Sequence, residues 1–187
     1  MKRHFVFNVL ASMLCLAFVT LMISSCHKED DLSTPTPPDV PAILEVGEGY
    51  KVSYHTYAKG VQVYVSTETS PGVYAWVFKE PIANLYSNAG FTGVVGTHYA
   101  GPTWESTSGS TVVAAKLEGV TVDPDAIPWL KLGAVSETGP GVFDDITHIL
   151  RVNTVGGKAP ATGANAATEG QETEIPYTAE YYFYKAE

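Results

Sequence analysis

Apolar residues recur at every second position through much of this 187-residue chain, and this spacing restricts the fold more than any other feature. Between residues 60 and 67, valines alternate with polar or aromatic side chains. Residues 73–78 are apolar at successive positions, which is typical of a strand buried on both faces. A period of two indicates extended strands, and no segment beyond the N-terminal apolar run shows a convincing amphipathic helical period.

The same alternation predicts further strands, separated by segments rich in glycine and proline. They cover residues 92–99, 110–117, 127–135, 145–153 and 177–184. Pro71 and Gly72 predict a hairpin turn, and residues 82–86 are expected to form one helical turn. Many short strands with such turns predict a single all-β domain, an antiparallel β-sandwich or barrel, over residues 42–187.

The N-terminal residues predict export and lipidation. Lys2 and Arg3 precede a nearly unbroken apolar run over residues 5–23, followed by Ser24-Ser25-Cys26. This order is typical of a secretory signal, and an uncleaved membrane anchor is the alternative. The last residues resemble a bacterial lipobox. We therefore predict a lipoprotein signal peptide over residues 1–25 and lipidation of Cys26, whose acyl chains would anchor the protein to a membrane.

Residues 26–41 are predicted to be an acidic and Pro-rich tether. Lys28 is followed by Glu29, Asp30 and Asp31, and residues 32–41 are rich in proline, serine and threonine. Such a composition forms a semi-extended spacer and no core. The charged run resembles the export signal of Bacteroidetes-type surface lipoproteins, and a plain solvated tether is the alternative. The predicted location is the outer membrane, on its periplasmic face or at the cell surface.

Charge and cysteine content exclude several functions. The chain has 20 acidic residues and 11 Lys and Arg, a net charge of −9. Loss of Lys2 and Arg3 with the signal leaves 11 − 2 = 9 basic residues and a charge of −11. Such a protein repels phosphate backbones, so no nucleic-acid partner is expected. The two cysteines are Cys15 and Cys26, so the mature chain would hold no free thiol, disulfide or thiolate metal site.

The stretch 96–111 is the candidate site, because it combines glycines with His98, Trp104 and Glu105 between predicted strands. His98 and Glu105 can form an acid–base pair or contribute two metal ligands. Their spacing matches no metal motif and two ligands are too few, so neither a metal nor a cofactor is predicted. The preferred alternative is structural, with His98 bonded to loop backbone and Trp104 filling the end of the core.

Other polar and aromatic residues have simpler interpretations. His148 lies among apolar residues and is expected in the core. The pairs Asp144-Asp145 and Asp123/Asp125 adjoin turn signals, so a turn role is preferred over glycoside or Ca²⁺ chemistry. Trp76, Trp104, Trp129 and the tyrosines can form a sugar-stacking surface, although most aromatic residues of a β-domain belong to its core. No nucleophile or nucleotide-binding motif is present.

Several short pieces carry a resemblance to one family. They include residues 60–64, 76–78, 98–105, 127–130, 153–160 and 176–184. In this order they resemble domain of unknown function 3455, found in secreted bacterial and fungal proteins, over nearly the whole domain. The family implies no established activity. Its members carry cysteines where this chain has Ser66 and Ala164, which implies that these two positions lie close in the fold.

Three functions remain open at this point. The first is a binding module for a glycan or peptide, with a site at His98, Trp104 and Glu105 joined by Trp129 and Arg151. The second is a hydrolase-like enzyme that uses His98 and Glu105 with Asp144 or His148. The third is a structural envelope lipoprotein. Convergence of His98, Glu105 and Arg151 at one pocket would favour the first two.

Overall fold

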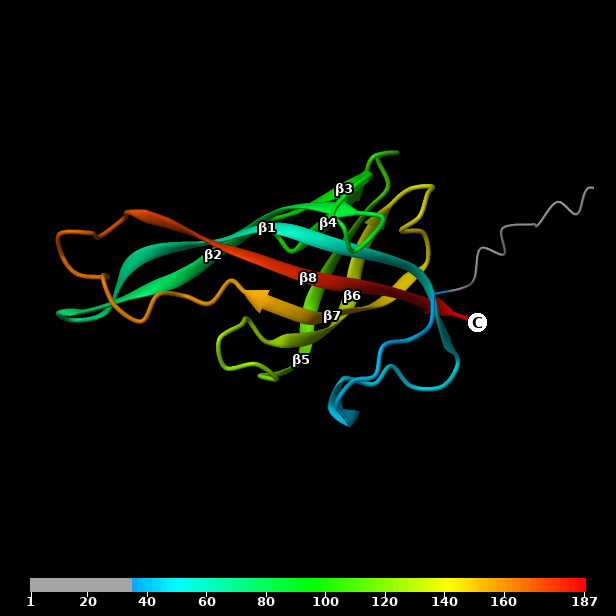
Figure 1. The fold of residues 1–187 in the computed structure, drawn as a ribbon, viewed down its shortest axis with the longest axis horizontal. Coiled ribbons are helices and arrows are strands. Elements are labelled where there is room, and N and C mark those ends of the chain that lie inside the picture. The colour runs from blue at the N-terminus through cyan, green and yellow to red at the C-terminus, as the bar shows by residue number, and fades with distance from the viewer. Residues whose placement is uncertain (1–34) are drawn as a thin grey trace, which may run out of the picture. The chain divides into compact units, whose positions relative to one another are not determined.

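A computed structural model describes residues 35–187. In this part of the chain eight antiparallel strands form a closed barrel in which each strand pairs with its neighbours in sequence and β8 pairs with β1 (Figure 1). The strands are β1 (Tyr50–Ser70), β2 (Val73–Tyr86), β3 (Val94–Tyr99), β4 (Thr103–Ser106), β5 (Thr111–Val120), β6 (Trp129–Thr138), β7 (Ile146–Gly156) and β8 (Glu172–Ala186), preceded by a 3₁₀ turn, η1 (Ala42–Leu44). No helix in the described residues is both long and apolar enough to cross a membrane.

The all-β prediction is confirmed, and the barrel alternative describes the topology. The predicted helical turn at residues 82–86 is wrong, because this segment is the last part of β2 and pairs with both β1 and β3. Ala83 and Leu85 are buried while Ile82 is half exposed, which is the alternation of a strand. The stretch 96–111 contains a strand as well, since β4 lies within it.

Strands β1, β2 and β8 extend beyond the other strands as a long twisted ribbon (Figure 1). The loop after β7 runs back along this ribbon. The Trp76 indole donates a hydrogen bond to the Thr162 carbonyl at 2.9 Å, and the Ser66 and Thr168 hydroxyls lie 3.0 Å apart. The loop that carries Ala164 therefore packs near Ser66, and the closeness of these two positions stays a prediction.

Gly60 allows β1 and β2 to approach closely where the barrel curves. It pairs with Ala83, and a Cβ atom at Gly60 would collide with the Ile82 carbonyl oxygen and the Ala83 backbone. Glycine within a strand often marks such a close approach between backbones. The wall of the barrel at this point therefore depends on the missing side chain.

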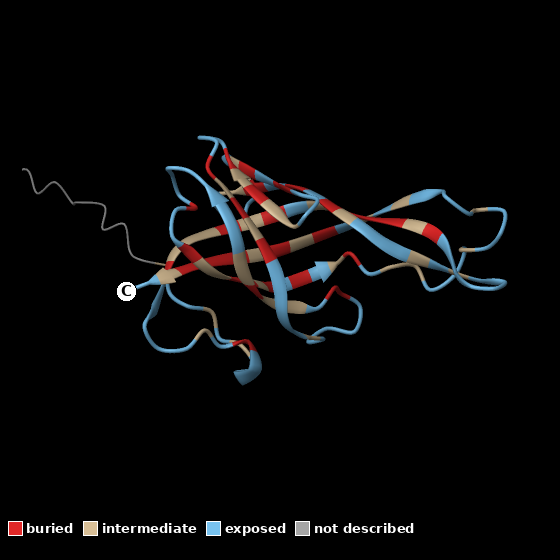
Figure 2. Cartoon of the chain, turned by 180° about the vertical axis from the view of Figure 1, so that it is seen from behind, coloured by how far each residue is buried: buried red, intermediate tan, exposed pale blue. Residues whose placement is uncertain are grey.

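Side chains on alternate positions fill the barrel with one apolar cluster, visible as buried bands along the strands in Figure 2. Leu85, Trp104, Tyr181 and Phe183 are among its most buried members. A second cluster lies on the opposite face of β7 and β8, where Val40 and Val46 of the N-terminal segment pack against it. Strands β7 and β8 are thus buried on both faces, and their register fixes which of their residues face the interior.

Candidate functional site inside the barrel

The barrel encloses a cavity of about 320 Å³ to which all of its strands contribute. Its lining residues are Gln62, Phe78, Lys79, Pro81, His98, Gly101, Pro102, Trp104, Lys116, Leu130, Leu132, Arg151 and Tyr181. Phe78, Lys79 and Lys116 are exposed and mark the solvent side, whereas Gln62, His98, Trp104 and Tyr181 are buried. The cavity thus has a polar inner end and a largely apolar wall.

His98 and Trp104 form one stacked pair at the inner end. They face each other across β3 and β4, with ring centroids 4.3 Å apart and planes 14° from parallel. The His98 Nδ1 atom lies 2.8 Å from the Thr103 carbonyl oxygen. A carbonyl only accepts, so Nδ1 is assigned the proton and Nε2 is left as an acceptor in the neutral ring.

Burial lowers the pKa of His98 to about 3. The bond to Thr103 opposes this shift, and the positive charge of Arg151 adds to it. His98 is consequently neutral at physiological pH. A base with so low a pKa is poorly matched to proton transfer near neutrality.

Arg151 brings a positive charge into the barrel from β7. Its Nε and Nη2 groups donate to the Pro128 carbonyl at 3.2 and 2.9 Å, which fixes the guanidinium. Within residues 35–187 no carboxylate forms an ion pair with it. Burial raises the pKa of the Tyr181 hydroxyl and the charge of Arg151 opposes the rise, so the two groups lie within electrostatic reach.

Most of the buried side-chain atoms that lack a hydrogen-bond partner gather at this end of the barrel. They are Gln62 Nε2, Trp104 Nε1 and the hydroxyls of Tyr177 and Tyr181, and Thr56 Oγ1 is the other such atom in the described residues. Tyr181 and Gln62 lie near enough to Tyr177 to shift the pKa of its hydroxyl, but the two hydroxyls and the Gln62 Nε2 group form no well-directed hydrogen bond. Unpartnered buried donors are rare and indicate water or a ligand.

Of the residues predicted for a site, the structure brings His98, Trp104 and Arg151 together at the cavity. Glu105 lies elsewhere. It follows the inward-facing Trp104 on β4, so its side chain points outward, where its carboxylate accepts a hydrogen bond from the Tyr99 hydroxyl at 2.8 Å. Trp129 packs half-buried against the outer apolar cluster. His98 and Glu105 therefore do not converge at one pocket, because Trp104 and Glu105, as neighbouring strand residues, face opposite sides of the sheet.

The other candidates also lie outside the cavity. His148 is half-buried beside the Tyr50 ring, 4.8 Å between centroids, and not in the core as predicted. An irregularity between Ile146 and His148 shifts the alternation there. The turn interpretation of the aspartates is confirmed at Asp123, whose carboxylate accepts from the Asp125 amide at 2.8 Å. Asp144 lies in the turn before β7.

Sequence reasoning missed Gln62, Tyr177 and Tyr181 as site residues. The pattern of β1 and β8 holds a partial signal. Gln62 is a polar residue on the strand face that also carries Gly60 and Tyr64, and Tyr177 and Tyr181 lie on one face of β8. Without the closed topology, however, nothing in the chain indicates which face of each strand is inside. Among residues 35–187 no three His, Cys, Asp or Glu side chains gather as a metal site would require.

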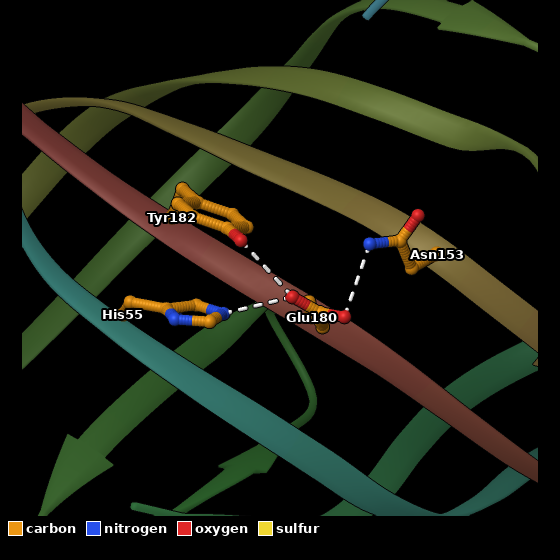
Figure 3. A network of polar contacts seen from close by, with 4 residues as sticks. All are labelled: His55, Asn153, Glu180 and Tyr182. Carbon is orange, nitrogen blue, oxygen red and sulfur yellow. Dashed lines mark hydrogen bonds and ion pairs between the residues drawn. The ribbon is translucent and has the colours of Figure 1, made fainter. Parts of the chain in front are cut away.

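A second polar cluster lies on the outer face of β1, β7 and β8 (Figure 3). The Glu180 carboxylate accepts hydrogen bonds from His55 Nε2, the Tyr182 hydroxyl and Asn153 Nδ2, each at 3.0 Å. The His55 ring stacks on Tyr182 with centroids 4.0 Å apart. Burial lowers the pKa of His55 while Glu180 opposes this shift. The residues of this cluster bond one another, so it fits a structural role.

The fold and cavity define the class of protein, a closed antiparallel β-barrel with an interior cavity rich in hydrogen-bond donors. Residues 47–185 match the model of the family described as "Protein of unknown function (DUF3455)", and the chain belongs to this family. The family resemblance seen in the sequence is thereby confirmed for the domain. No curated protein and no solved structure matches the chain significantly.

Proposed function

We propose that the domain binds a small organic ligand inside its barrel. The observation that carries the proposal is the set of buried donors without partners, Gln62 Nε2, Trp104 Nε1 and the Tyr181 hydroxyl, which lie at the cavity. Each buried polar group left without a bond destabilises a protein by about 1–3 kcal/mol. A ligand that accepts these bonds removes the penalty, and this supports a binding role.

The shape of the cavity supports a small molecule over the glycan or peptide expected from the sequence. Its volume of about 320 Å³ is at the lower end for pockets that enclose organic ligands, roughly 300–1,000 Å³. Leu130, Leu132 and Pro102 supply an apolar wall, and the buried polar groups gather at the inner end. A few polar groups in an apolar pocket fix a ligand's orientation, and the paired strands hold these groups in place before it binds.

The geometry gives no support to the hydrolase alternative. No aspartate or glutamate lines the cavity, and the low pKa of His98 leaves it a weak base. The purely structural alternative accounts for the unpartnered donors only if water fills the cavity, and it gives no role to the apolar wall beside them. Binding is therefore the function that the described residues support best.

We also propose that the domain is tethered to a membrane by Cys26. Residues 1–25 with the signal, Cys26 and most of the 26–41 tether lie outside the described residues, and the family match begins at residue 47. The lipobox-like sequence supports lipidation, and the acidic run supports placement on the outer membrane. Growth with an alkyne analogue of palmitate should label the wild-type protein and leave Cys26→Ala unlabelled; label on the variant would contradict the proposal.

Tryptophan fluorescence tests ligand binding at the cavity. The chain has three tryptophans, of which Trp104 lines the cavity and Trp129 lies outside it. A full-length variant that keeps only Trp104 should change its emission with a small organic compound that also raises the melting temperature. The matched variant that keeps only Trp129 should stay silent. If compounds that raise the melting temperature changed the emission of Trp129 and left the emission of Trp104 unchanged, the binding site would lie outside the cavity.

A further inference from the structure

We infer that the ligand is an organic monocarboxylate with an apolar body, and that Arg151 binds its carboxylate. This inference rests on the proposed function and assigns a chemical class to the ligand. Its first support is the contrast between the cavity and the rest of the chain. The protein carries 20 acidic and 11 basic residues, yet Lys79, Lys116 and Arg151 line the cavity and no acidic residue does.

A positive pocket in an acidic protein selects anions. Charges of one sign in a cleft with low-dielectric walls concentrate the field and raise the local concentration of the opposite charge. The negative surface elsewhere repels the same anion and would not compete for it. The positive charge of the cavity lining is therefore a property of the site, because the composition of the whole chain is acidic.

Arg151 is the cation best placed to bind a buried anion. Lys79 is exposed and already pairs with Glu172 at 2.7 Å and with Glu80 at 3.4 Å, whereas Arg151 has no acidic partner in residues 35–187. Its Nε and Nη2 groups bond Pro128, and the Tyr181 hydroxyl also lies within hydrogen-bonding reach of the guanidinium, so a ligand near Tyr181 would meet Arg151 as well. A guanidinium has five N–H donors in a planar fork, which matches a carboxylate.

The neighbouring groups donate more hydrogen bonds than they accept. Gln62 Nε2 and Trp104 Nε1 can only donate, and the Tyr181 hydroxyl needs an acceptor as well. A carboxylate presents two oxygens that only accept, so it satisfies such a set. A neutral amide presents one acceptor oxygen in place of two, and its NH₂ group finds an acceptor at this end of the cavity in His98 Nε2 but not in Gln62 Nε2, Trp104 Nε1 or Arg151.

The rest of the lining sets the body of the ligand. Phe78, Pro102, Leu130 and Leu132 offer hydrocarbon surface between the polar end and solvent. Burying apolar area contributes about 25 cal/mol per Å², so an alkyl chain or flat ring adds affinity here. Small inorganic anions lack this body and are expected to bind weakly.

Matched pairs of acids and primary amides test the inference. We would titrate the full-length protein with octanoate and octanamide, with 2-naphthoate and 2-naphthamide, and with indole-3-acetate and its amide, using calorimetry. At least one acid should bind ten-fold or more tightly than its amide. In Arg151→Gln that preference should fall to about two-fold, while Lys131→Gln, changed outside the cavity lining, should keep it. Arg151→Lys, which retains the charge, should keep part of the preference, and it serves if Arg151→Gln does not fold.

The outcomes separate the two proposals. Amides that bind as tightly as their acids, with a response from the single-Trp104 variant, would overturn the carboxylate inference and leave ligand binding intact. An acid preference that persists unchanged in both Arg151 variants would overturn the assignment to Arg151. If no compound binds and the Trp104 emission never changes, the proposed function itself fails.

Discussion

Two polar clusters occupy opposite faces of the same three strands, and they differ in how fully their groups are bonded. The inner cluster takes Gln62 from β1, Arg151 from β7 and Tyr181 from β8. The outer cluster takes His55 from β1, Asn153 from β7, and Glu180 with Tyr182 from β8 (Figure 3). Only the outer cluster contains a carboxylate, and that carboxylate accepts three hydrogen bonds.

The difference shows how to distinguish a structural cluster from a binding cluster. Outside, Glu180 supplies acceptors for the donors around it, so the cluster is complete. Inside, Arg151 donates to the Pro128 carbonyl but pairs with no carboxylate among the described residues, and the buried donors have no acceptor there. The inner cluster therefore resembles the outer cluster with its carboxylate removed: the donors are present and the acceptor is missing. We propose that a bound ligand supplies the missing carboxylate.

Trp104→Ala should have the largest effect on stability. The side chain is 1% exposed and packs against His98, Tyr181 and Phe183. Removing a buried tryptophan destabilises a protein by about 3–5 kcal/mol through lost burial and the cavity left behind. Urea unfolding should show this loss. Trp129→Ala, changed on the outer face, should lose clearly less and keep ligand binding; an equal loss would contradict the interior placement of Trp104.

Gly60→Ala should disturb the wall that holds both clusters. A Cβ at this position meets the Ile82 carbonyl oxygen and the Ala83 backbone, which cannot move away as a flexible side chain can. Overpacking of this kind destabilises by about 1–3 kcal/mol. Gly47→Ala is the control, because a Cβ there meets nothing within 4 Å. Thermal unfolding in which the two variants match would show that β1 and β2 are not this close.

His98 should make stability depend on pH. Its folded-state pKa is lowered from 6.5 to about 3, so between these values the unfolded chain binds a proton that the folded chain excludes. Its contribution to stability therefore falls as pH drops below about 6.5, by about 2 kcal/mol between pH 7 and pH 5.

The measurement is the free energy of unfolding of wild type relative to His98→Gln at both pH values. The subtraction removes groups that titrate alike in both proteins, including His55 and His148. A difference that does not change with pH would contradict the burial of a neutral His98.

Glu180→Gln should have the smallest effect. It removes a charge that accepts three hydrogen bonds but leaves an amide of the same shape, so we expect a loss of about 1–2 kcal/mol. Ligand affinity should stay within about two-fold, because the outer cluster faces away from the cavity. A large loss of affinity in calorimetry would mean that the outer cluster also acts in binding.

The sequence predicts the strands better than it predicts the site, for physical reasons. Alternation with a period of two is local, so most strands can be predicted from the chain. The prediction fails at residues 82–86, the end of β2, because this segment is too short to show its period. Barrel closure is non-local. The sequence predicts His98, Trp104 and Arg151 as candidate site residues, and all three line the cavity. Glu105 and Trp129 differ from them only in the face on which they lie, which the register decides.

The sequence also fails to single out residues that become important in the fold, namely Gln62, Tyr177 and Tyr181. Each occupies an ordinary position in an alternating strand, and each becomes notable only when closure buries it without a partner. The polar character of the interior therefore follows from the topology, and no short motif carries it.

NMR of the nitrogen-bound side-chain protons tests the central claim most directly. The Trp104 indole and Gln62 amide should shift together when a bound acid from the panel is titrated, because both donors acquire an acceptor. The indole protons of Trp76, bonded to Thr162, and of Trp129 should stay in place. A bound acid that shifts the Trp129 signal and leaves Trp104 and Gln62 unchanged would contradict the account, since the unpartnered donors of the barrel would then not be the ligand's partners.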